Sequence, residues 1–149
     1  MKFNFKLEPV LKHRQMKEDI AKKEYAEAEQ KVQQSLTIIN GYYDQIEELR
    51  NLNANKQKNG GNVSAYMDLN IEMIEGTKKK IEKEKQKVRE LMQIAEEKKE
   101  IMIEARQEKR VIESLKNKRF EEYKKYRKKL EQKQIDEMVS QRYARLINE

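Results

Sequence analysis

The side chains that could carry acid–base or nucleophilic chemistry are few in this sequence. It contains one histidine, His13, and no cysteine. His13 lies on a polar stretch, and nothing near it resembles a nucleophile that its imidazole could activate. The adjacent carboxylates Glu121 and Glu122 stand among lysines, where ion pairs along a helix account for them without acid or base catalysis. We therefore expect no enzymatic activity and no catalytic residues.

Ligands for metals and cofactors are equally scarce. A zinc site built from protein ligands needs several His or Cys side chains, which this composition does not supply. The pair Gly60-Gly61 lies in an Asn-rich segment, and it lacks both the spacing of a phosphate-binding loop and a preceding strand. The sequence therefore predicts no metal and no cofactor.

The apolar runs of the chain are too short for targeting or membrane insertion. The residues after Met1 carry charge but no apolar stretch of signal-peptide length, and no later segment approaches the length of a membrane span. The absence of cysteine fits a reducing compartment. We expect a cytoplasmic protein.

Most of the net charge of +7 is concentrated in residues 110–133, which we call the basic segment. The segment contains ten Lys or Arg and four Glu, so six of the seven surplus charges lie there. Phe120, Tyr123 and Tyr126 are interleaved with these charges. A basic face of this kind attracts acidic protein surface, phosphate or anionic lipid.

The elements that must position these residues are long helices. Charged residues make up 41% of the chain and hydrophobic ones 36%, which favours a narrow apolar seam over a thick core. Pro9 suits the first turn of a helix over about residues 8–53. Apolar residues then alternate steps of four and three, the pattern of a coiled coil, with one polar member: Ala21, Tyr25, Ala28, Val32, Ser35, Ile39, Tyr42, Ile46 and Leu49.

A second helix is predicted over about residues 64–147, after a turn at about residues 54–63 that includes Gly60-Gly61. Glu84, Lys98 and Lys109 fall near its seam, where each is expected to weaken the pairing. The seam itself is predicted from its apolar residues: Ile74, Ile81, Val88, Leu91, Ala95, Met102, Ala105 and Ile112. We therefore predict an all-α fold, one antiparallel coiled-coil hairpin whose second helix is the longer.

The unequal helix lengths leave part of the second helix without a partner helix. Folding about the turn places Leu11 opposite Ala105 or Arg106, so residues beyond about Ile112 should project past the first helix. This projecting part includes most of the basic segment. It is predicted to be either a solvated or self-associating helix end or a docking surface for another protein.

Tyr66, Leu69 and Met73 are difficult to place, because Ile74 already supplies the seam at that point. Plain packing near the turn would account for them. An exposed cluster of Met and aromatic residues can also serve as an adaptable binding surface.

Four short motifs resemble a known family. The chain begins Phe3-x-Phe5-x-Leu7-x-Pro9-Val10-Leu11-x-x-Arg14, has Tyr42-Tyr43 before the Asn/Gly turn, opens its second helix with Tyr66, and runs Asp136-Glu137-Met138-Val139-Ser140-Gln141-Arg142 near its end. In this combination, over essentially its whole length, the chain resembles FliJ, the small coiled-coil protein of the bacterial flagellar type III export apparatus.

The resemblance implies a function and a set of partners. It implies a stalk like that of rotary ATPases, inserted into the hexameric flagellar export ATPase, coupled to the membrane export gate, and able to escort export chaperones. Association with the cytoplasmic face of the inner membrane would be peripheral, through these partners. Residues implied to face the gate are Tyr66, Leu69 and Met73. Residues implied to face the ATPase are Phe3, Phe5, Leu7, Leu11, Arg14, Arg119, Phe120, Tyr123, Arg127 and Arg142.

Two other functions remain open from the residues alone. The basic segment with its aromatic residues is compatible with a nucleic-acid-binding coiled coil. Nucleic acid is nevertheless disfavoured as a partner, because four glutamates interrupt the segment and the preceding seam is not a Leu-rich zipper. The other alternative is a structural coiled coil that dimerises through the projecting part of its second helix.

Overall fold

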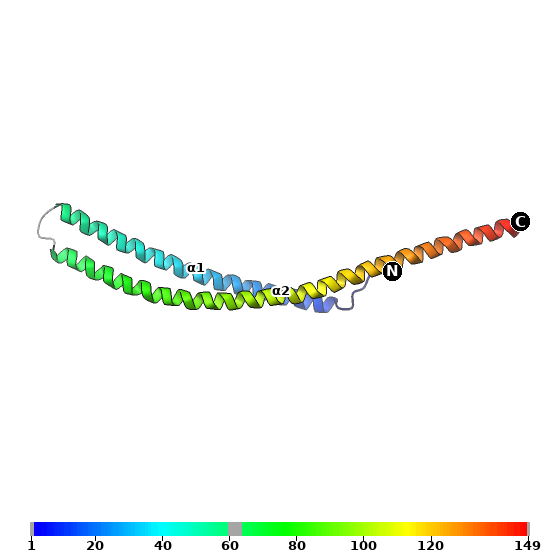
Figure 1. Cartoon of the computed structure of the whole chain (residues 1–149), viewed down its shortest axis with the longest axis horizontal. Coiled ribbons are helices and arrows are strands. Elements are labelled where there is room, and N and C mark those ends of the chain that lie inside the picture. The colour runs from blue at the N-terminus through cyan, green and yellow to red at the C-terminus, as the bar shows by residue number, and fades with distance from the viewer. Residues whose placement is uncertain (1, 60–63, 149) are drawn as a thin grey trace. The chain divides into compact units, whose positions relative to one another are not determined.

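The computed structural model describes residues 2–59 and 64–148, and within these ranges it contains two long helices (Figure 1). Helix α1 spans Glu8–Asn59, and the longer helix α2 spans Ser64–Asn148. They pack as an antiparallel hairpin, which confirms the predicted fold class. The predicted Gly60-Gly61 turn lies outside the described residues.

Helix α1 begins where the sequence predicts. The Glu8 backbone N–H donates to the Phe5 carbonyl at 3.1 Å, and the Leu11 N–H donates to the Leu7 carbonyl at 2.9 Å. Pro9, which has no N–H to donate, occupies the first turn, and the Glu8 carboxylate is favourable beside the positive end of the helix dipole.

The far end of α1 differs from the prediction, because the helix continues to Asn59 and not only to about residue 53. Cross-helix hydrogen bonds from asparagines accompany this extension. The Asn53 amide donates to the Met67 carbonyl at 3.3 Å and accepts a hydrogen bond from the Asn70 amide at 2.8 Å. Asn53, near the end of α1, and Asn70, near the start of α2, therefore join the two helices.

The longer α1 changes which residues face each other, so the predicted start of the unpaired part of α2 is wrong. Glu8 forms an ion pair with Lys116 at 2.8 Å, and Phe3 contacts Phe120 and Tyr123. Pairing therefore passes Ile112 and reaches Tyr123. Beyond that residue, α2 continues without a partner helix among the described residues (Figure 1).

The chain divides into two compact units. One, which we call the turn-side unit, is Asp19–Ile103. Its core is the predicted heptad seam, and burying each Ile or Val contributes about 1.5–3 kcal/mol relative to exposure. The buried seam residues form two clusters, one of Ile39, Ile46, Ile74, Ile81 and Val88 and the other of Ala28, Val32 and Ala95.

Two charged residues expected to weaken this seam have partners across it. Ser35 Oγ donates to the Glu84 carboxylate at 2.6 Å, and Lys98 Nζ lies 3.3 Å from the Glu24 carboxylate. Polar groups near the seam are therefore matched between the helices, which offsets part of the cost of placing them there.

The second unit, which we call the terminal unit, combines residues 2–18 with residues 104–148. Its seam contains more charge than that of the turn-side unit, since Arg14, Glu18 and Lys109 occupy or flank it. Phe5 and Ala105 are its buried apolar residues, exposed by 5% and 1%. No helix among the described residues has the length and apolar character needed to cross a membrane.

Candidate functional site

The residues before α1 fold onto α2 through aromatic packing. The Phe3 ring meets the Phe120 ring edge-on, with centroids 5.2 Å apart, and its centroid lies 5.5 Å from that of Tyr123. Phe5 is buried, and Leu7 and Leu11 are half-buried. The structure therefore brings three of the predicted ATPase-facing residues, Phe3, Phe120 and Tyr123, into direct contact.

Arg14, also predicted to face the ATPase, forms an ion pair within the terminal unit. Its guanidinium donates to the Glu108 carboxylate, which also accepts a hydrogen bond from Lys17 Nζ at 3.3 Å. The hydrogen bond from Lys17, followed by that from Arg14, lowers the pKa of the Glu108 carboxyl below its ordinary value. Arg14 therefore joins α1 to α2 and is about one-third exposed.

Next to this pair lies a buried ion cluster centred on Glu18, which the sequence analysis did not identify. The Glu18 side chain is 1% exposed. Its carboxylate lies 2.6 Å from Lys109 Nζ and 3.5 Å from Arg106 Nε. The heptad spacing could have predicted that Glu18 is buried, because Glu18 precedes Ala21 by three positions and so continues the seam toward the start of α1. Lys109, expected to weaken the pairing, instead supplies its positive charge.

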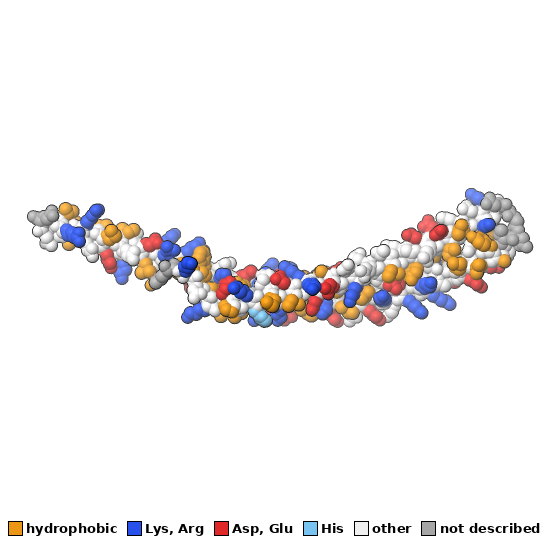
Figure 2. Space-filling model, turned by 180° about the vertical axis from the view of Figure 1, so that it is seen from behind, with side chains coloured by type: hydrophobic (Ala, Val, Ile, Leu, Met, Phe, Trp, Pro, Cys, Tyr) orange, Lys and Arg blue, Asp and Glu red, His pale blue; other side chains and the backbone are white. Residues whose placement is uncertain are grey.

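The part of the basic segment after Tyr123 is exposed except for half-buried Leu130. Arg127 pairs with Glu131 at 3.4 Å, and Lys124 lies 3.5 Å from Glu121 and 4.6 Å from the centroid of the Phe120 ring. These contacts run along one helix and leave the charges in solvent. Figure 2 shows Lys and Arg side chains interspersed with hydrophobic ones on this part of α2.

The predicted ATPase-facing arginines are not all gathered together. Arg119, Arg127 and Arg142 are exposed on α2, and they spread along the helix over more than twenty residues. The aromatic contacts of Phe3 form a compact site, whereas these guanidinium groups form an extended charged surface.

The three residues predicted to face the export gate are exposed at the start of α2. Exposed fractions are 38% for Tyr66, 55% for Leu69 and 51% for Met73. Lys56 Nζ lies 5.2 Å from the centroid of the Tyr66 ring, a cation–π contact across the hairpin. Seam packing does not account for Leu69 or Met73, so they form an exposed apolar surface.

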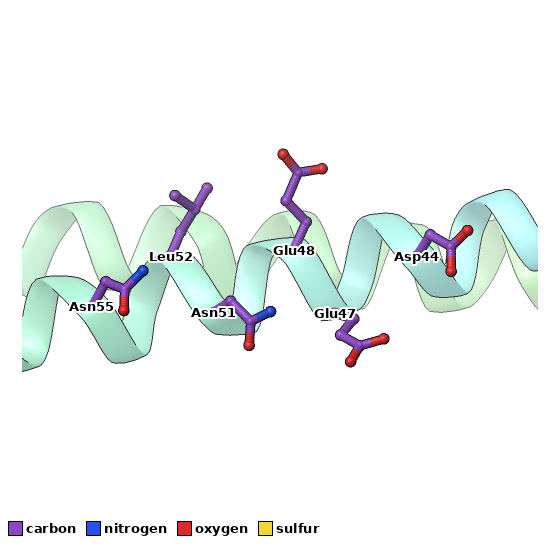
Figure 3. A pocket seen from close by; sticks show the side chains of 6 residues that line it. All are labelled: Asp44, Glu47, Glu48, Asn51, Leu52 and Asn55. Carbon is purple, nitrogen blue, oxygen red and sulfur yellow. The ribbon is translucent and has the colours of Figure 1, made fainter.

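An acidic depression on α1 does not have the geometry of a ligand site. Figure 3 shows that the side chains lining it point in different directions, Glu48 and Leu52 to one side and Glu47 and Asn51 to the other. Among the described residues, no group of His, Asp or Glu is placed to hold a metal ion.

Of three comparisons with known proteins, one finds a match. Searches of curated proteins and of solved structures found no match. A family model described as "Flagellar FliJ protein" matches residues 2–146, nearly the whole chain. This match confirms the resemblance seen in the sequence motifs. The chain belongs to the FliJ family, a component of the flagellar export apparatus.

Proposed function

We propose that this protein is a non-enzymatic stalk of the flagellar type III export apparatus, held by the ring of the hexameric export ATPase. The observation that carries the proposal is the basic part of α2 beyond Tyr123, which is exposed and lacks a partner helix among the described residues. A positive, extended helix suits a ring whose inner surface carries acidic side chains. The Phe3–Phe120–Tyr123 cluster is part of the same unit and supports that helix.

We assign the export-gate contact to Tyr66, Leu69 and Met73. These residues form an exposed surface of Met, Leu and Tyr side chains, which adapts readily to a protein partner. In this proposal the protein works in the cytoplasm, at the inner face of the membrane, and reaches the membrane through its partners. Escort of export chaperones is the further role that family membership suggests.

The proposal predicts that the purified protein promotes assembly of the cognate ATPase into hexamers and raises its rate of ATP hydrolysis at moderate salt. Replacing Lys125, Lys128 and Lys129 by Gln should abolish most of this stimulation, because these exposed charges supply long-range attraction. The measurements are the sedimentation profile of the ATPase and its rate of phosphate release.

A matched control replaces three other exposed lysines, Lys78, Lys79 and Lys80, by Gln in the turn-side unit. The two variants lose the same charge, so the control separates the position of the charge from its amount. The control should stimulate the ATPase as the parent protein does. Equal loss of stimulation in both variants, or no stimulation by the parent protein, would contradict the proposal.

A further inference from the structure

The unpaired end of α2 presents two apolar faces. Tyr123, Tyr126 and Leu130 continue the heptad seam in steps of three and four. An α-helix turns about 100° per residue, so Ile135 and Leu146 lie roughly 140–160° around the helix from Leu130. The seam phase itself ends at Leu130, because its next members would be the polar residues Lys133 and Glu137. The second face is therefore separate from the seam.

This second face consists of Ile135, Met138, Val139 and Leu146, which we call the C-terminal stripe. Exposed fractions are 53% for Ile135, 69% for Met138, 62% for Val139 and 70% for Leu146. The spacing places all four along one side of the helix. A partner that extends the coiled-coil seam cannot also cover the stripe, since the two faces point in nearly opposite directions.

Two arginines accompany the stripe. Arg142 lies between Val139 and Leu146 on the same side of the helix, and a shallow depression is lined by Arg142 and Arg145 together with Ile135, Met138 and Val139. Among the described residues, neither guanidinium forms an ion pair with a carboxylate. Basic residues earlier in the helix do form such pairs, for example Arg127 with Glu131. Within the described part of the chain, the depression therefore combines an apolar surface with two positive charges that no carboxylate neutralises.

We propose that the C-terminal stripe binds an amphipathic helix of another protein, one whose apolar face is bordered by Asp or Glu. Such a helix fills the apolar depression and supplies carboxylates to Arg142 and Arg145, which bind them in a bidentate way. Arg142, which the family resemblance groups with the ATPase-facing residues, is assigned here to a different face. The proposal does not depend on the ATPase contact.

The charge of this region argues against a second copy of the chain as the occupant. Residues 124–148 contain eight Lys or Arg and three Asp or Glu. Two such segments lying side by side repel each other, whereas an acidic helix is attracted.

The test uses the full-length protein and two synthetic helical peptides of about three heptads. Both peptides carry the same Leu and Ile face, bordered by Glu in one and by Lys in the other. We expect the acidic peptide to bind at least about tenfold more tightly in a fluorescence-anisotropy titration. Ile135→Asp combined with Val139→Asp should abolish binding, and Arg142→Glu combined with Arg145→Glu should reverse the preference.

Tyr126→Asp is the matched control, because Tyr126 is 54% exposed on the seam face of the same helix. This variant should bind the acidic peptide as the parent does, and circular dichroism checks that all variants keep their helix content. Equal affinity for the two peptides, or binding that survives both double variants, overturns the proposal. It is also overturned if the stripe variants abolish dimer formation or binding to anionic phospholipid vesicles but leave peptide binding unchanged.

Discussion

At the residue scale, the charges within the seam of the terminal unit distinguish it from an apolar coiled coil. Glu18, 1% exposed, is the only buried charged side chain within residues 2–59 and 64–148. Burying a carboxylate is costly unless cations and hydrogen bonds surround it, and here Lys109 and Arg106 do so. Such a cluster favours one pairing of the helices, because a shift of either helix leaves the carboxylate buried without its partners.

Glu18→Gln should lower the free energy of unfolding by about 2 kcal/mol. Removing one partner of a fully buried ion pair costs ~3–5 kcal/mol, and the loss is smaller here because Arg106 is partly exposed. The substitution keeps the side-chain size but removes the buried carboxylate that lies 2.6 Å from Lys109 Nζ, and Glu113, at 3.8 Å, lies farther from that ammonium group. Urea unfolding followed by circular dichroism measures the change. Glu24→Gln is the control, since that carboxylate is 46% exposed and its ion pair with Lys98 is worth about 0–1 kcal/mol. Equal losses in the two variants would show that burial of the charge does not matter.

Glu108 makes the stability of the terminal unit depend on pH. Its hydrogen bonds with Lys17 and Arg14 lower its pKa in the folded state below the unfolded value. The resulting stabilisation is complete above the unfolded pKa of a Glu, about 4.3, and is lost as the pH falls through the lower, folded pKa. The melting temperature of the parent protein should therefore exceed that of Glu108→Gln at neutral pH, and the difference should shrink on acidification below about pH 4. A difference that stays constant with pH would contradict this assignment.

At the element scale, the heptad seam and the start of α1 could be predicted because they depend on local spacing. Ala21 to Leu49 follow one phase, and the predicted members Val32, Ile39 and Ile46 are buried. The end of α1 could not be predicted from local preference. Asn53 and Asn70 favour turns in isolation, but their amides bond to each other across the hairpin. Tertiary contact thus overrides the turn preference.

The partners of the polar seam residues could not be predicted for a related reason. Opposite residues are set by where the first helix ends, so an error of a few residues there changes every pairing along the hairpin. Lys109 looks unfavourable in the sequence and becomes favourable only once Glu18 lies 2.6 Å away. The contact of Phe3 with Phe120 could likewise not be predicted, because the two residues lie far apart in the sequence.

At the scale of the whole molecule, the pairing of α1 with α2 depends on different interactions in each of the two units. In the turn-side unit the helices pair through Ile39, Ile46, Ile74, Ile81 and Val88, whose burial does not depend on charge. In the terminal unit they pair largely through Glu8–Lys116, Arg14–Glu108 and Glu18–Lys109. Dissolved salt screens charges that are near the surface but does not weaken apolar burial. The two units should therefore respond differently to salt.

Hydrogen–deuterium exchange at about 0.05 M and about 0.5 M sodium chloride tests this difference. The Debye length, roughly 10 Å at 0.1 M, falls about threefold between these two concentrations. Amides of residues 10–18 should exchange severalfold faster at the higher salt concentration, because the ion pairs that hold this part of α1 against α2 are weakened. Amides of residues 74–88 should exchange at the same rate or more slowly. Glu8→Ala, which removes the ion pair with Lys116, should mimic high salt only in residues 10–18. An equal rise in exchange rate in both regions would show that the ion pairs do not stabilise the terminal unit. The aromatic packing of Phe3 and the burial of Phe5 would then have to provide most of its stability.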